Sequence, residues 1–192
     1  MLNALGLVVP LAFASGVNLY ATVAVLGLSS HYGLVALPEQ FRVFDNPVII
    51  TAALAMYLVE FVADKIPWFD SAWDVVHTAV RPLGGALVAV TALGEASPAA
   101  NALVALLGGS IAMTTHLTKA GTRAAANTSP EPFSNWALSL GEDALAVGIS
   151  YVALQHPIVA LAIALLLLGV IALFASIIVR FVRRRFRRQP AA

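Results

Sequence analysis

The chain has 192 residues, of which 60% are hydrophobic and 11% charged, against roughly 45–50% and about 25% in an average soluble domain. These proportions exclude an ordinary water-soluble domain, because its surface would need many more charged side chains. The absence of cysteine excludes a disulfide framework, cysteine-ligated zinc, iron–sulfur clusters and thiol catalysis.

Six apolar segments are predicted to cross a membrane as helices. All but the first have 20–23 residues, or about 30–35 Å as a helix, which matches a hydrocarbon core of roughly 30 Å. Three of them begin with a proline, which suits the first turn of a helix. The segments are Leu2–Leu28, Pro47–Ile66, Ala72–Leu93, Pro98–Ala120, Phe133–Leu154 and Pro157–Val179.

Weak internal similarity divides the chain into two membrane repeats of three segments each, residues 1–97 and 98–182, followed by a basic tail at 183–192. Asn3-Ala4-Leu5 aligns with Asn101-Ala102-Leu103, and Glu60 aligns with Glu142. An odd number of spans inverts the second repeat relative to the first. The sequence thus predicts an all-α membrane protein built from two inverted-topology three-helix repeats.

The first and fourth segments are predicted to be interrupted. The first contains Ser15-Gly16-Val17-Asn18 at its centre, and the fourth contains Gly108-Gly109 and then a polar stretch that includes His116. An interrupted helix leaves backbone N–H and C=O groups without hydrogen-bond partners, and lipid cannot supply them. A pair of interrupted segments is typical of a transporter binding site. The alternative is that each is a kink packed against neighbouring Ser and Thr residues.

The distribution of Lys and Arg predicts that both termini are cytoplasmic. Six of the eleven basic residues lie in the last thirteen positions, and cytoplasmic loops are enriched in these residues. Because the tail directly follows a membrane segment, we expect it to contact anionic lipid headgroups of the bilayer and not nucleic acid.

Three carboxylates interrupt the apolar segments: Glu60 in the second, and Glu142 with Asp143 in the fifth. Insertion scales put three such charges at about 8–10 kcal/mol in total, so they must be protonated, paired or facing water. One interpretation is a cation or proton site shared by the two repeats. The other is a set of structural bonds, with Asn135, Ser139 or a basic residue as partners.

Two polar stripes flank these carboxylates. The third segment carries Asp70, Asp74, His77 and Arg81 at helical spacing, and the fourth carries His116, Lys119, Arg123 and Asn127. The opposite charges predict ion pairs between the two helices, and Glu60 and Asp64 are positioned to contact Arg81. Asp70 and Asp74 are equally explained as first-turn acids, with Ser71 and Asp74 spaced as a capping box.

The sequence contains no glycine-rich phosphate loop, zinc-protease pattern or nucleophile elbow, so we expect neither an enzyme nor a cofactor. Its four histidines are too scattered to indicate a metal cage.

Several stretches of the sequence resemble the bacterial integral-membrane family called domain of unknown function 4126. They are 15–22 (SGVNLYAT), 67–71 (PWFDS) with His77 and Arg81-Pro82, 119–123 (KAGTR) and 127–135 (NTSPEPFSN).

The resemblance covers about residues 3 to 180 and implies a small polytopic protein of the inner membrane, with no activity to carry over. The leading hypothesis is a transporter or channel for a cation, a proton or a proton-coupled solute, acting as a homo-oligomer. The alternatives are an anionic-lipid or lipid-phosphate handling protein and a structural membrane module. The candidate substrate-binding or ion-binding residues are Asn18, Glu60, Asp64, His77, Arg81, His116, Lys119, Arg123, Asn127, Asn135, Glu142 and Asp143.

Overall fold

A computed structural model describes residues 2–128 and 133–187, and all the regular structure in these two ranges is helical. The expected all-α class is therefore confirmed. In this described part of the chain, seven α-helices and one short 3-10 helix follow one another. They are α1 (Leu2–Val17), α2 (Leu19–His31), η1 (Glu39–Phe44), α3 (Pro47–Ala63), α4 (Pro67–Leu93), α5 (Pro98–Ala126), α6 (Phe133–Gln155) and α7 (Pro157–Arg187).

Local sequence explains most of the helix starts. The side chains of Asn46 and Ser97 accept hydrogen bonds from backbone N–H groups in the first turns of α3 and α5, each with proline as the next residue. Helix α4 instead begins at Pro67 with no side-chain cap. The predicted capping box at Ser71 and Asp74 is therefore wrong, because both residues lie inside the helix.

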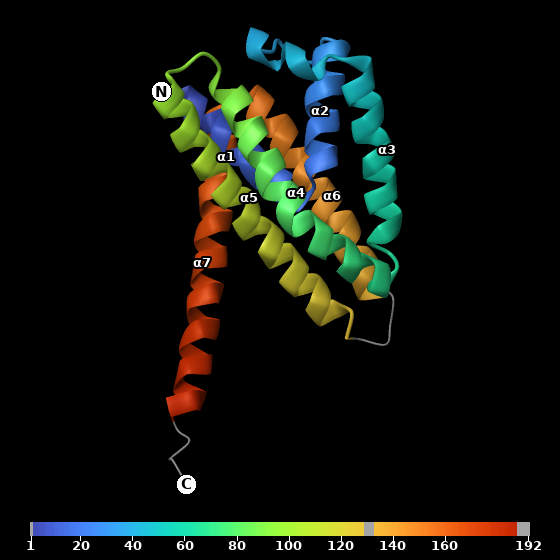
Figure 1. Cartoon of the computed structure of the whole chain (residues 1–192), viewed down its shortest axis with the longest axis vertical. Helices are drawn as coiled ribbons and strands as arrows, with labels where there is room; N and C mark the ends of the chain where they lie inside the picture. Colours follow the sequence, from blue (N-terminus) through green and yellow to red (C-terminus); the bar gives the residue numbers. More distant parts are fainter. Residues whose placement is uncertain (1, 129–132, 188–192) are drawn as a thin grey trace.

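Helices α1 and α2 form a hairpin that enters and leaves the bundle at the same end. Gly6 of α1 packs on Pro157, the first residue of α7, and Gly27 of α2 packs on Ile50 near the start of α3. The chain turns at Asn18, deep in the bundle (Figure 1). The predicted break in the first segment is confirmed, and the segment Leu2–Leu28 is divided between two helices that run in opposite directions.

Helix α5 is continuous over 29 residues, so the prediction of a second interrupted segment is wrong. Its glycines serve a close approach to α4 instead. A Cβ on Gly108 would lie 2.9 Å from the carbonyl oxygen of Gly85, and one on Gly109 would lie 3.1 Å from that of Pro82. Small residues at such contacts let membrane helices pack closely while every backbone hydrogen bond within the helix is kept.

The remaining helices surround the hairpin (Figure 1). We call the end at which α3, α5 and α7 begin the upper end, and the end at which α4 and α6 begin the lower end. Helix α1 is almost completely buried among α4, α5, α6 and α7, whereas α3 packs mainly on α2. The lower part of α7 projects beyond the bundle, and the start of α1 and the end of α7 lie at opposite ends of the described structure (Figure 1).

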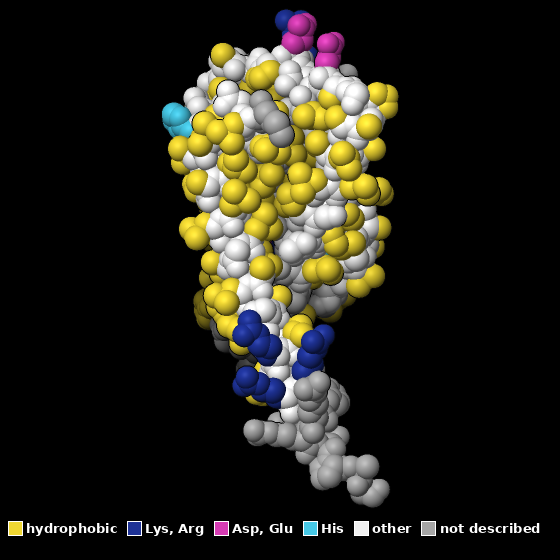
Figure 2. Space-filling model, turned by 90° about the vertical axis from the view of Figure 1, so that its left-hand side faces the viewer, with side chains coloured by type: hydrophobic (Ala, Val, Ile, Leu, Met, Phe, Trp, Pro, Cys, Tyr) yellow, Lys and Arg dark blue, Asp and Glu magenta, His cyan; other side chains and the backbone are white. Residues whose placement is uncertain are grey.

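Among the described residues, four helices have the length and hydropathy needed to span a membrane, with the spanning parts Trp68–Leu93, Pro98–Ala126, Phe133–Gln155 and Pro157–Phe181. Helices α1, α2 and α3 are apolar but shorter. Figure 2 shows a broad hydrophobic surface, with acidic groups at the upper end and basic groups at the lower end. The chain thus has several potential spans, but the six-span inverted repeat is not confirmed.

The basic tail predicted at 183–192 begins as a direct continuation of α7. This helix extends to Arg187, and residues 188–192 lie outside the described part of the chain.

Candidate functional site

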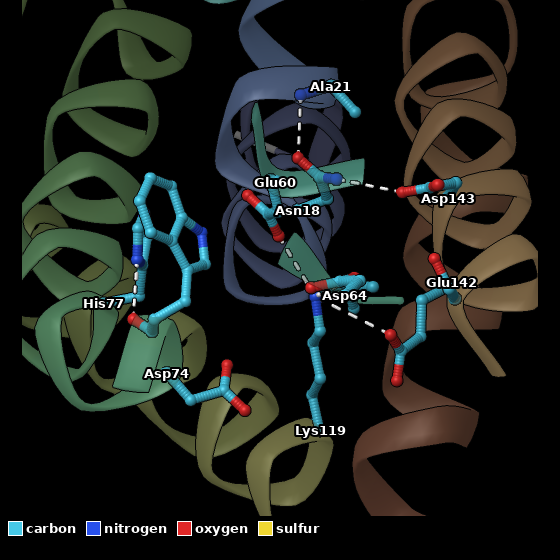
Figure 3. Close-up of polar contacts among 12 residues, drawn as sticks. Asn18, Ala21, Glu60, Asp64, Asp74, His77, Lys119, Glu142 and Asp143 are labelled. Atoms are coloured by element: carbon cyan, nitrogen blue, oxygen red, sulfur yellow. Dashed lines mark hydrogen bonds and ion pairs between the residues drawn. The ribbon is translucent and has the colours of Figure 1, made fainter. Parts of the chain in front are cut away.

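The tip of the hairpin is held by Asn18, whose side chain is fully buried. Its Oδ1 accepts a hydrogen bond from the backbone N–H of Ala21 at 2.9 Å and so caps α2. Its Nδ2 donates to Oδ1 of Asp143 in the middle of α6, also at 2.9 Å (Figure 3). One side chain therefore both starts α2 and ties the hairpin to α6.

The other side of the break is held by Arg81 of α4. Its Nη1 donates to the carbonyl oxygens of Gly16, at 2.7 Å, and Val17, and its Nη2 pairs with Glu60 of α3. The last carbonyls of a helix lack partners within it and carry the negative end of its dipole, so a guanidinium stabilises them on both counts. Arg81 and Glu60 are both fully buried.

Below this pair, three carboxylates converge on the ammonium group of Lys119 from α5 (Figure 3). Its Nζ lies 3.0 Å from Oε1 of Glu60 on α3 and 3.2 Å from Oδ2 of Asp64, the C-cap residue directly after α3. It also lies 3.6 Å from Oε2 of Glu142 on α6. Lys119 thus joins the two glutamates that the sequence aligned between the repeats.

One turn further down α5, the fully buried guanidinium of Arg123 joins α3, α4 and α6. It contacts Oδ1 of Asp70 at 2.9 and 3.1 Å and lies 3.5 Å from Oδ1 of Asp64. It also donates to the backbone carbonyls of Asn135, at 3.0 Å, and Asp64. The predicted ion pairing between the two polar stripes is confirmed by Arg123 and Asp70.

Two asparagines complete the lower edge of this network. Nδ2 of Asn127 donates to Oδ2 of Asp70 at 2.8 Å, and Nδ2 of Asn135 donates to the backbone carbonyl of Asp64 at 3.2 Å. Both belong to the stretch 127–135, of which residues 129–132 lie outside the described part of the chain. The two ends of that stretch therefore reach Asp70 and Asp64, the two acidic residues that Arg123 also contacts.

His77 and His116, the two candidate histidines, lie beside the network on the α4 and α5 side. His77 Nδ1 lies 2.9 Å from the carbonyl oxygen of Trp73, and its Nε2 lies 3.0 Å from the hydroxyl of Tyr20. Because a carbonyl only accepts, Nδ1 carries the hydrogen and Nε2 accepts from the tyrosine. His116 Nε2 lies 3.1 Å from the carbonyl oxygen of Asp74, so the hydrogen is on Nε2 and its buried Nδ1 has no hydrogen-bond partner in the described residues.

The cluster holds more acidic than basic side chains. Its acids are Glu60, Asp64, Asp70, Asp74, Glu142 and Asp143, and its bases are Arg81, Lys119 and Arg123. All are at least nine-tenths buried except Glu142, whose side chain is 14% exposed. Within residues 2–128 and 133–187, no three acidic or histidine side chains are arranged to hold a metal ion.

A pocket of about 200 Å³ opens between α4 and α5 in the lower half of the bundle. Asp74 and Thr78 line it together with Ser71 and Ala120. Asp74 lies on the α4 side of the group around Lys119 (Figure 3). This acid therefore belongs to the cluster and also borders the pocket.

All twelve candidate residues from the sequence lie in or beside this one network. Glu142 and Asp143 have different partners, however, because Glu142 lies near Lys119 whereas Asp143 binds the hairpin tip. Asp70, Asp74 and Tyr20 belong to the network but were not among the twelve candidates. The two aspartates belong to the polar stripe of the third segment, but a role in capping offered an equally simple explanation.

Comparison with known proteins places the chain in one family. The family described as "Domain of unknown function (DUF4126)" has a model that matches residues 5–176. No curated protein and no solved structure matches the chain. The match includes every residue of the buried network, and the chain belongs to the DUF4126 family, as its polar stretches predicted.

Proposed function

We propose that the protein is a small transporter or channel of the bacterial inner membrane that moves a cation, a proton or a proton-coupled solute. The observation that carries this proposal is the excess of buried acids at the tip of a re-entrant hairpin. Six carboxylates there face three permanent cations. The bases occupy the centre of the network, and the acids surround them.

An excess of buried negative charge is too costly to remain uncompensated, because each unpaired carboxylate loses its hydration. Lys65 at the edge of the cluster is only partly buried, and its Nζ donates to the carbonyl oxygen of Phe61 and to Ser139. Counting Lys65 still leaves two acids in excess. The cluster must therefore take up protons or a cation, which is the first requirement of a cation-coupled transporter.

The broken helix supports the same function. Discontinuous helices place backbone carbonyls and N–H groups inside the membrane, where transporters use them to bind ions and substrates. Here Arg81 occupies the carbonyl end of α1, and Asn18 occupies the N–H end of α2. Motion of α4 would expose the carbonyl oxygens at the end of α1, because Arg81 belongs to α4, whereas motion of α6 would free the side-chain amide of Asn18 from Asp143.

The positive charges support an orientation with the lower end in the cytoplasm. This end carries Lys65 and the arginines at the end of α7, whereas Arg42 is at the upper end. In this orientation, α3 to α7 cross the membrane five times and the hairpin enters from outside. The pocket beside Asp74 then provides access from the cytoplasmic half. The N-terminus would be external, contrary to the expectation from the sequence.

The direct test is flux through the full-length protein in liposomes, measured as dissipation of a pH gradient and as uptake of alkali cations. We expect Glu60→Gln combined with Glu142→Gln to abolish flux. Glu95→Gln, in the exposed loop after α4, is the matched control and should transport like the parent. Parental flux in the double variant would refute the carboxylate assignment. If the parent shows no flux but the double variant loses thermal stability, the protein is a structural module instead.

The lipid-phosphate alternative has less support, because Lys119 and Arg123 are both buried and both paired with carboxylates. They have no free charge to offer a phosphate.

A homo-oligomer remains part of the proposal, since a single chain of 20.1 kDa encloses little space for a pathway. Light scattering of the purified protein, corrected for detergent, tests this part separately.

A further inference from the structure

The lower half of α6, residues 133–143, is polar on the side that faces the bundle. Its buried side chains are Asn135, Ser139 and Asp143, which recur every fourth residue on one face of the helix. The large apolar side chain of Trp136 is instead exposed. In the upper half of α6 the buried residues are mostly apolar. The lower half therefore contacts the bundle mainly through polar groups, an arrangement that membrane helices use where they face water or an ion pathway.

Several hydrogen-bond acceptors at this contact have no donor. Nδ2 of Asn135 donates to the backbone carbonyl of Asp64, which identifies the other atom of the amide as the acceptor Oδ1. That Oδ1, Oδ2 of Asp143 and Oε2 of Glu142 are buried without a hydrogen-bond partner in the described residues. Ordered water is the usual partner of buried polar groups that the protein itself leaves unpaired. The contact between α6 and the helices opposite it therefore calls for water.

Glu142 is the least tightly held acid at this contact (Figure 3). Its Oε2 lies 3.6 Å from Nζ of Lys119 and 3.8 Å from Nη1 of Arg123, too far for a hydrogen bond to either. Glu60 and Asp64, in contrast, accept hydrogen bonds from Lys119 at 3.0 and 3.2 Å. Glu142 also has the most exposed side chain of the six acids. It is therefore the acid that is best placed to exchange a proton with water.

A proton on Glu142 would act on α6 alone. It would neutralise the carboxylate and so remove its attraction to Lys119 and Arg123. Both cations would keep their contacts with the acids of α3 and α4, so the other helices would stay joined while α6 is loosened. A metal cation at the same place would lie beside two positive groups and be repelled. Asp74 forms no ion pair among the described residues, so a proton there would change no ion pair between helices.

We propose that the contact between the lower half of α6 and Lys119 is a water-filled entrance for protons and that Glu142 receives them, an inference that rests on the proposed function and names its ion. A hydronium ion gives its proton to a carboxylate oxygen of Glu142, which becomes a neutral acid while water is released. The charged groups that face Glu142 are Lys119 and Arg123 of α5, Asp64 at the end of α3 and, further away, Arg81 of α4. Loosening of α6 then gives water access to the rest of the network.

Water at this contact is tested in the cysteine-free full-length chain. Ser139→Cys and Ser150→Cys each replace a fully buried serine on the same face of α6, the first in the lower half and the second in the upper half. A small cationic methanethiosulfonate modifies a thiolate only where water reaches it, so we expect Ser139→Cys to react roughly tenfold faster than Ser150→Cys, or more. Equal rates would overturn the water-filled entrance.

The proton on Glu142 is tested by infrared difference spectroscopy of the full-length protein. The pH is stepped from alkaline to near neutral, a range in which exposed carboxyl groups stay ionised. We expect the C=O band of a protonated carboxyl group to appear in the parent and in Glu95→Gln, the exposed control, and to be absent from Glu142→Gln. A band that persists in Glu142→Gln, or that disappears in Asp74→Asn instead, would overturn the assignment. So would the absence of the band from the parent.

Neither measurement depends on flux, so transport and the proton site fail separately. Uptake of alkali cations into liposomes without proton binding by Glu142 would refute the proton site and leave transport in place. Proton binding by Glu142 in a protein without flux would refute transport and leave the proton site in place. The cysteine measurement keeps Glu142 in the chain, so it still decides on the entrance if Glu142→Gln does not fold.

Discussion

Removal of the Arg81 guanidinium should destabilise the protein more than removal of any exposed charge. In Arg81→Met, Glu60 loses one of its two cations, and the carbonyl oxygens of Gly16 and Val17 lose their donor. Glu60 keeps its contact with Lys119, so we take the low end of the cost of breaking a buried ion pair, about 3 kcal/mol.

The two carbonyls add about 1 kcal/mol each, again at the low end for buried groups left without partners. The total is about 5 kcal/mol, which corresponds to roughly 10–20 °C in melting temperature for a chain of this size. In the double variant Arg81→Met with Glu60→Met, the unpaired carboxylate is gone. About 3 kcal/mol, or roughly 6–12 °C, should therefore be recovered relative to Arg81→Met alone.

Thermal unfolding of the purified protein, followed by tryptophan fluorescence in one detergent, measures the parent, both single variants and the double variant. Arg42→Met is the matched control, because Arg42 has a side chain that is 77% exposed and should shift the melting temperature very little. A decrease in melting temperature of less than about 3 °C in Arg81→Met would refute the claim that Arg81 stabilises the break between α1 and α2. So would a double variant whose loss equals the sum of the two single losses.

Three further predictions concern the hairpin and the orientation of the chain. Asn18→Ala removes the N-cap of α2 and the hydrogen bond from Asn18 to α6. It should lower the free energy of unfolding by about 1–3 kcal/mol, measured by the same thermal assay; unchanged stability would mean that these two bonds do not stabilise the protein. Gly16→Ala should destabilise the protein strongly, because its Cβ would overlap the side chain of Thr115 and a backbone carbonyl of α5. Gly148→Ala meets open space and should be neutral; equal melting temperatures for the two variants would contradict the close packing of α1 on α5. In the cysteine-free chain, Leu2→Cys should react with an impermeant maleimide on intact spheroplasts, and Arg184→Cys only after permeabilisation; labelling of both from one side would restore the six-span topology.

The break at Asn18 was predictable because its cause is local. A glycine followed by a good N-cap residue can end one helix and start the next within a few positions. The two glycines of α5 give the same local signal, yet Gly108 and Gly109 serve tight packing against α4. A sequence alone does not distinguish these uses, because the distinction depends on which helix lies opposite the glycines.

The partner of Arg81 was predictable for a similar reason. A buried arginine requires an acid, and Glu60 and Asp64 were both positioned to supply it; the structure pairs Arg81 with Glu60. The direction of α2 was not predictable, because the apolar segment of 27 residues from Leu2 to Leu28 has the length of a span whether it continues or turns back. The backbone turn at Asn18 and the contacts of Gly27 decide it, and both depend on distant helices.

The order of synthesis poses a particular problem for the hairpin. Asn18 and its partner Asp143 are separated by 125 residues, and Gly16 is 65 residues ahead of Arg81. At roughly 5–20 residues per second, the ribosome needs about 6–25 s after making Asn18 to deliver Asp143. During that time the side-chain amide of Asn18 lacks its acceptor, and until Arg81 is made the carbonyl oxygens of Gly16 and Val17 lack their donor in lipid. We therefore expect α1 and α2, which are synthesised first, to stay at the membrane surface and to enter the bundle last.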